Sequence, residues 1–208
     1  LIHADNEIYF THGADVTTAG GDIILWSNRN SVTSASTAHR IALTNGSTLT
    51  SNGGNIVFGG GADGDSDGYP DGYAYVGSSD STWSGITFID TVTLFSGNGN
   101  ITLKGQSGAS ADRPGIDFAG YVTMNAGTGV VHINGITDIS SNAEPGNHEV
   151  SGIYSSGTLK ITSESDSIHA ITLIGNATGA QPNTGTGINS IHGISFDGEG
   201  MTEITATG

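Results

Sequence analysis

The chain contains no cysteine and only five basic side chains among its 208 residues. Without disulfides, it is either a cytosolic protein or a large secreted bacterial protein stabilised by repetition, and the Thr/Ser/Asn/Gly-rich, lysine-poor composition favours the second. Twenty acidic side chains give a formal charge of −15, which argues against nucleic acid and anionic membranes as partners. No run approaches the roughly 18–20 consecutive apolar residues of a membrane span. Four prolines without a Gly-X-Y period exclude collagen.

Glycine, by contrast, is abundant, with 34 copies, and it punctuates a repeat. Each strong copy consists of two short runs of alternating apolar and polar residues joined by a Gly/Asn turn, which is typical of half-buried strands. The three strong copies are STLTSNGGNIVFGG at 47–60, DTVTLFSGNGNITLKG at 90–105 and GYVTMNAGTGVVHING at 120–135.

A further short strand, with a Gly-Ile start in most copies, precedes each pair. The Gly-Ile spacing grows from 30 residues (Gly85 to Gly115) to 37 (Gly115 to Gly152) and 41 (Gly152 to Gly193). The extra length always falls after the N-I-T-L strand. Insertions at one position of every repeat are typical of loops that project from one edge of a solenoid.

These patterns predict an all-β fold, a right-handed parallel β-helix with projecting loops, in which residues 1–208 form one repeat segment of a longer chain. A single thin repeat cannot be stable alone, so its neighbours must stack. An antiparallel sandwich is the alternative, although the recurrent insertion favours the helix. The β-helix predicts two inner columns and one polar corner, formed by Ile23, Ile56, Ile101 and Val131; by Leu49, Leu94 and Met124; and by Asp22, Asn55 and Asn100.

The strings AGGDIILWS, SNGGNIVFGGGADGDSDG, LFSGNGNITLKGQS and MNAGTGVVHING, which fall within residues 16–163, carry a family resemblance. They resemble the repeats of filamentous-haemagglutinin-type two-partner-secretion exoproteins, which are large bacterial surface adhesins. The resemblance implies a location outside the cell at the bacterial surface, and a function in adhesion.

The sharpest chemical motif is D-G-D-S-D-G-Y-P-D at 63–71. Its carboxylates occupy positions 1, 3, 5 and 9 of an EF-type calcium loop, with glycine at position 6 and a backbone carbonyl at position 7. Alanine replaces the bidentate glutamate of position 12, so we expect weak Ca²⁺ binding; the alternative is a solvated acidic turn. The predicted ligands are Asp63, Asp65, Asp67, Tyr69 and Asp71.

The same insertion, at about 59–84, carries four aromatic side chains, Tyr69, Tyr73, Tyr75 and Trp83. Aromatic side chains on a loop can stack on sugar rings or anchor a partner. The alternative, which we favour, is that they fold the loop back onto the sheets. A second candidate binding loop lies at 134–151.

No catalytic motif is recognised, and we expect no enzymatic activity. Asp117 and Asp138 are candidate carboxylates, but the paired carboxylates of a polysaccharide hydrolase are not evident, and a polysaccharide lyase or hydrolase is the third alternative. The first expectation is a structural and adhesive stalk or filament, and the second is a Ca²⁺-dependent module that binds a carbohydrate or receptor. The expected partners are further coils of the same chain or identical subunits stacked end to end, and a glycan or protein of a cell surface or matrix.

Overall fold

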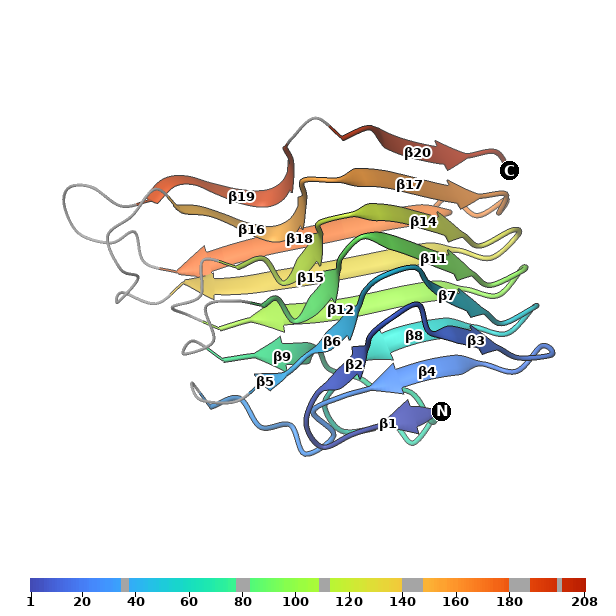
Figure 1. Cartoon of the computed structure of the whole chain (residues 1–208), viewed down its shortest axis with the longest axis horizontal. Helices are drawn as coiled ribbons and strands as arrows, with labels where there is room; N and C mark the ends of the chain where they lie inside the picture. Colours follow the sequence, from blue (N-terminus) through green and yellow to red (C-terminus); the bar gives the residue numbers. More distant parts are fainter. Residues whose placement is uncertain (35–37, 78–82, 109–112, 140–147, 180–187, 198–199) are drawn as a thin grey trace.

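The structure is a computed structural model, and it describes residues 1–34, 38–77, 83–108, 113–139, 148–179, 188–197 and 200–208. Within these ranges the regular secondary structure consists of β-strands alone, and the strands form three sheets (Figure 1). With one exception, every pairing between these strands is parallel, which confirms the all-β prediction and excludes the antiparallel sandwich. No helix of the described residues has the length and apolar character needed to cross a membrane.

We name the three sheets A, B and C. In sheet A, β5 (Ala38–His39) and β9 (Ala74–Val76) form the one antiparallel pair, and they lie beside the main path. The main path of sheet A, in spatial order, is β1 (Ile2–His3), β4 (Ile23–Trp26), β8 (Ile56–Gly59), β12 (Ile101–Ser107), β15 (Val131–Ile139) and β18 (Ile171–Gly179).

Sheets B and C contain six strands each. Sheet B contains β2 (Ile8–Phe10), β6 (Ile41–Leu43), β10 (Ile86–Phe88), β13 (Ile116–Phe118), β16 (His148–Ser155) and β19 (Ile188–Phe196). Sheet C contains β3 (Asp15–Thr17), β7 (Ser47–Thr50), β11 (Thr91–Phe95), β14 (Tyr121–Asn125), β17 (Thr158–Ser163) and β20 (Thr202–Ala206).

The chain visits the sheets in a fixed order, B then C then A, and each visit adds a strand beside the one laid down on the previous round. The Gly-Ile, V-T-L and N-I-T-L runs of the sequence correspond to sheets B, C and A. This succession is compatible with a solenoid.

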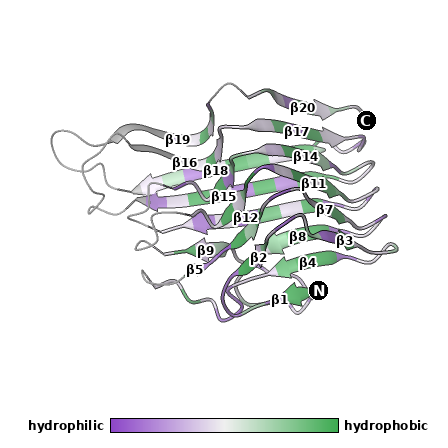
Figure 2. Ribbon diagram, viewed as in Figure 1, coloured by the Kyte–Doolittle hydropathy of each residue, from purple (hydrophilic) through white to green (hydrophobic). Residues whose placement is uncertain are grey.

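The core consists of apolar columns that run across the sheets. Figure 2 shows hydrophobic and hydrophilic residues alternating along many of the strands, as period-two burial requires. Both predicted inner columns are confirmed. In sheet A, Ile23 pairs with Ile56, Ile56 with Ile101 and Ile101 with Val131, and all four side chains are buried. In sheet C, Leu94 lies between Leu49 and Met124, again in buried positions.

The corner between sheets C and A is held by side-chain oxygens. The N–H of Asn55 donates to Asp22 Oδ1 (2.6 Å), that of Asn100 to Asn55 Oδ1 (2.9 Å) and that of Val130 to Asn100 Oδ1 (2.9 Å). The predicted corner therefore bridges successive coils, through side chain to backbone bonds. The preceding turns have positive φ at Gly53 (114°) and other Gly and Asn residues, as predicted.

The predicted insertion at 59–84 needs correction. The projecting part closes where Gly60 and Gly72 form an antiparallel bridge, and the chain then re-enters sheet A as β9. In β12, residues 101–103 pair with β8 and residues 105–107 pair with β9, so the loop leaves the sheet from the middle of what is one strand in the next coil. Residues 78–82 lie outside the described ranges.

The predicted loop at 134–151 is also narrower than expected, because residues 134–139 belong to β15 and residues 148–151 to β16. Both strands pair in parallel with neighbouring coils. Residues 140–147, which join them, lie outside the described ranges.

Candidate functional site

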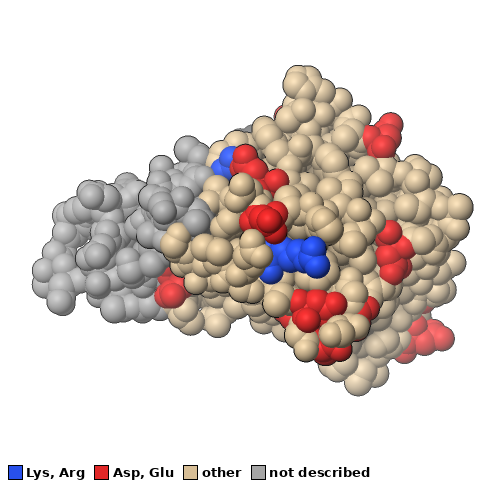
Figure 3. Space-filling model, turned by 90° about the horizontal axis from the view of Figure 1, so that it is seen from below, with Lys and Arg blue, Asp and Glu red and all other residues tan. Residues whose placement is uncertain are grey.

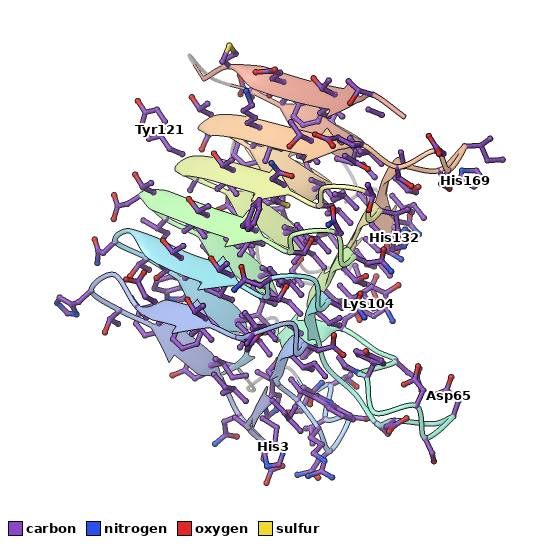
Figure 4. All side chains as sticks on the ribbon, turned by 90° about the vertical axis from the view of Figure 1, so that its right-hand side faces the viewer. His3, Asp65, Lys104, Tyr121, His132 and His169 are labelled. Atoms are coloured by element: carbon purple, nitrogen blue, oxygen red, sulfur yellow. The ribbon has the colours of Figure 1, made fainter. Side chains whose placement is uncertain are left out.

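The candidate site is the Asp-rich loop and the outer face of sheet A beside it. Figure 4 shows Asp65 on a loop that projects away from the sheets, on the same side as Lys104 and His132 and opposite Tyr121. The Lys104 Nζ ties the loop to β12, because it donates to the carbonyl oxygens of Pro70 (3.2 Å) and Asp71 (3.3 Å). Lys104 lies between the part of β12 that pairs with β8 and the part that pairs with β9, where the loop leaves the sheet.

Three of the predicted ligands form a group that could hold a metal ion. One carboxylate oxygen from each of Asp63, Asp65 and Asp71 lies within 4.8 Å of the others. Asp67 is not part of this group, and like the other three carboxylates it accepts a backbone hydrogen bond, at Oδ1 from the Tyr69 N–H (2.8 Å). The Ca²⁺ assignment stays a prediction, and the geometry makes Asp63, Asp65 and Asp71 its central residues.

The carboxylates of the loop repel one another. A hydrogen bond from the Asp67 N–H lowers the pKa of Asp65, but slight desolvation and the negative charges of Asp67, Asp71 and Asp63 outweigh it. The pKa of Asp65 is therefore raised above its ordinary value. A bound cation would remove this repulsion.

Tyr69 folds the loop back onto the outer face of sheet A. Its ring packs against a small apolar cluster formed by Ile24, Trp26 and Val57. Its hydroxyl donates to Asp22 Oδ2 and accepts from Asn55 Nδ2 (3.2 Å). The hydrogen bond to Asp22 is the main reason why the pKa of Tyr69 is raised. The ring thus holds the loop against the corner of the fold.

The other three aromatic side chains occupy different places. Tyr73 is half-buried, and its hydroxyl accepts from Asn134 Nδ2 (2.9 Å). Tyr75 is buried in β9, and desolvation raises its pKa. Trp83 lies against Tyr9, with ring centroids 5.7 Å apart, and against the Arg40 guanidinium, 4.5 Å from its ring. The structure therefore brings Tyr73 and Tyr75 together, while Trp83 belongs to another surface.

Tyr73 and Tyr75 border a cleft of about 160 Å³. One wall is the 28–33 segment, the other is the loop, and the β12 residue Gln106 also contributes. The lining residues are Asn28, Ser31, Thr33, Gly61, Gly72, Tyr73, Tyr75 and Gln106. None of these side chains is charged.

The candidate catalytic carboxylates lie in different sheets, Asp117 in β13 of sheet B and Asp138 in β15 of sheet A. Burial raises the pKa of Asp117 to about 6, against the lowering effect of Arg113. Its Oδ1 is buried and has no hydrogen-bond partner among the described residues.

No protein-family model, curated protein or solved structure matches the chain. The site must therefore be interpreted from its own residues.

Sequence reasoning missed the cleft. Asn28 and Gln106 belong to no recognisable motif. They line the same cleft only because the loop projects beside the 28–33 segment. It also missed β18 as a repeat copy, although a signal was present, since ITLIG at 171–175 matches ITLKG at 101–105. Gly105, Gly135 and Gly175 pair in register. A Cβ at each would lie 2.4, 2.1 and 1.9 Å from the carbonyl oxygens of Gly115, Gly152 and Gly193, so each position requires glycine.

Proposed function

We propose that the chain is a coil segment of a right-handed parallel β-helix that serves as an extracellular structural and adhesive stalk or filament of a large bacterial surface protein. The observation that carries the proposal is the register of the three sheets. Each round of the chain places a similar apolar side chain next to that of the previous round, so stacking is the main source of order. Such stacking suits a long rod, because each coil needs only its neighbours.

The ends of the columns support association along the rod axis. Among the described strands, β18, β19 and β20 each pair on one side only. Ile204 continues the column of Leu49, Leu94 and Met124 through Ile161, yet it is 41% exposed. Phe196 occupies the same register position as Phe88 and Phe118, with Ser155 between Phe118 and Phe196, and it is 47% exposed. A further coil, from the same chain or from an identical subunit, would bury both.

The charge distribution supports a partner that is not strongly acidic. Figure 3 shows Asp and Glu in several separate groups on one face, with few Lys and Arg among them. A formal charge of −15 repels anionic polymers. A neutral glycan or a protein of a cell surface or matrix fits this surface better.

A second candidate is a Ca²⁺-dependent binding module. It is favoured by the grouping of Asp63, Asp65 and Asp71 on the loop that walls the cleft. The two functions differ in what the loop contributes. The stalk needs the sheets, whereas the module needs the loop.

The test is attachment of cells that display the chain on their surface, measured under flow on matrix-coated glass. The matched variant lacks residues 60–73. The deletion joins Gly59 directly to Ala74, so that β8 and β9 form one continuous strand, as Lys104 and Gly105 do in β12. We expect attachment above that of cells carrying an empty anchor, retained by the deletion variant. Loss of attachment only in the deletion variant would favour the binding module. No attachment by either protein, when both are folded and displayed, would contradict the adhesive function.

A further inference from the structure

The walls of the cleft beside the Asp-rich loop are fixed to each other. Asn28, in a left-handed conformation (φ 49°), accepts hydrogen bonds at its carbonyl oxygen from the N–H groups of Ser31 (2.9 Å) and Gly61 (3.0 Å). Ser31 Oγ accepts from the Ala62 N–H (3.0 Å). These bonds join the 28–33 turn to the loop, so the cleft is formed before any ligand arrives.

Asn28 supplies an unused donor inside the cleft. Its side chain is only 3% exposed, and its Oδ1 accepts from the Val32 N–H (2.8 Å), which fixes the orientation of the amide. Among the described residues, no group accepts a hydrogen bond from its Nδ2. A water or a ligand in the cleft can therefore accept a hydrogen bond from Nδ2.

Two further residues that line the cleft leave hydrogen-bonding capacity unused. No hydrogen bond joins the Gln106 amide to another residue in the part of the chain that the structure describes. The Tyr73 hydroxyl accepts from Asn134 Nδ2, which leaves its own hydrogen free to donate. The cleft thus combines donors, one amide that both donates and accepts, and two aromatic rings.

From this arrangement we propose that the cleft is a subsite for a single neutral sugar ring. Sugar hydroxyls both donate and accept, which matches Asn28, Gln106 and Tyr73, and the C–H face of a sugar packs against aromatic rings. An anionic ligand does not match, because no cationic side chain lines the cleft. The volume of about 160 Å³ is below the roughly 300–1,000 Å³ of pockets for drug-sized ligands, so one ring is the unit bound.

The subsite rests on the second candidate function, the binding module, for which it names the class of ligand, because the loop that the 60–73 deletion removes forms one wall of the cleft. The two proposals fail in different experiments. Sugar binding is measured with the purified chain in solution, and attachment is measured with displayed cells. A cleft that binds no sugar leaves the stalk function standing.

The test is saturation-transfer-difference NMR with methyl glycosides of glucose, galactose, mannose and N-acetylglucosamine, and with N-acetylneuraminic acid as the anionic comparison. Asn28→Asp keeps the acceptor for Val32 and replaces the free donor with an acceptor, and Gln106→Ala removes the second amide. The control is Thr102→Ala, on the outer face of the same sheet but outside the cleft. Urea midpoints establish that each variant is folded.

We expect saturation transfer to at least one neutral glycoside, a Kd raised roughly tenfold by Asn28→Asp or Gln106→Ala, and no change with Thr102→Ala. The proposal is overturned if no neutral glycoside receives saturation. It is equally overturned if both cleft variants bind as the unmodified chain does, or if the anionic sugar binds most tightly.

Discussion

The backbone N–H of Asn100 donates to the side-chain Oδ1 of Asn55 across the gap between two successive coils, at 2.9 Å. Asn55 stands in the same relation to Asp22 one coil earlier (2.6 Å). Side-chain oxygens thus satisfy backbone donors at a corner where the sheet hydrogen bonds are interrupted. This corner also holds the loop, since Asn55 Nδ2 donates to the Tyr69 hydroxyl.

Replacing Asn55 with alanine should therefore destabilise the fold by about 0.5–1.5 kcal/mol, since the exposed Asn100 N–H exchanges its side-chain acceptor for water. The measurement is the free energy of unfolding in urea. Thr102→Ala serves as the control, because no hydrogen bond of its side chain is described and it lies on the outer face of the same sheet. Equal destabilisation by the two substitutions would show that the corner bonds contribute nothing specific.

The aromatic column in the core gives a second prediction. Phe88 stacks between Phe58 (centroids 6.2 Å apart) and Phe118 (5.2 Å), and all three side chains are fully buried. Phe88→Ala should lower the free energy of unfolding by about 3–5 kcal/mol through lost burial and a cavity. Phe95→Ala, the same change at an exposed position of sheet C, should stay within about 0.5 kcal/mol. Comparable losses would mean that the column is not the centre of the core.

Calcium binding can be tested at single carboxylates. If Asp63, Asp65 and Asp71 form the site, Asp65→Asn should abolish the calorimetric signal of a Ca²⁺ titration, with the unmodified chain binding at roughly 10⁻⁴–10⁻³ M. Asp67→Asn should weaken binding less, because the Asp67 carboxylate is not one of the three whose oxygens converge. The EF-type interpretation of the sequence instead counts Asp67 among the ligands. No heat of binding up to several millimolar Ca²⁺ would reduce the motif to a solvated turn.

The pH dependence of stability should report Asp117. Its pKa is raised from 3.8 to about 6 by burial, so the folded state holds the proton more tightly than the unfolded state. Its contribution to stability is therefore fully present below about pH 4 and is lost as the pH rises through about 6.

Asp117→Asn should remove this slope and raise the free energy of unfolding near pH 7, by up to about 3 kcal/mol. Urea unfolding at several pH values between 4 and 8 measures the effect. Asp15→Asn, at an exposed position of β3, is the control. An unchanged slope in Asp117→Asn would assign the pH dependence to other groups.

The repeat pattern predicted the strands and the columns because both depend on nearest-neighbour rules. Alternation fixes which side of a strand is buried, and the Gly/Asn turns fix where each strand ends, so Ile56 could be placed over Ile23 without any knowledge of the loops. The corner oxygens of Asp22 and Asn55 could be placed for the same reason.

The site could be predicted only in part. The carboxylate spacing at 63–71 predicted a group of acids, but whether Asp67 faces the others depends on local backbone bonds that spacing does not encode. The cleft depends on the return of the chain through β9, which sets Tyr75 beside Gln106, a residue of the following coil. Three residues of β9 carry too short an alternation to be recognised as a strand.

The interruption between β8 and β9 separates two properties that are usually linked in a protein. Because β12 continues past Lys104 in register with both β8 and β9, one group of residues sets the stacking of the strands and another sets what projects from their surface. Segments of foreign sequence could therefore be grafted between Gly60 and Gly72 without changing the strand pairing on either side.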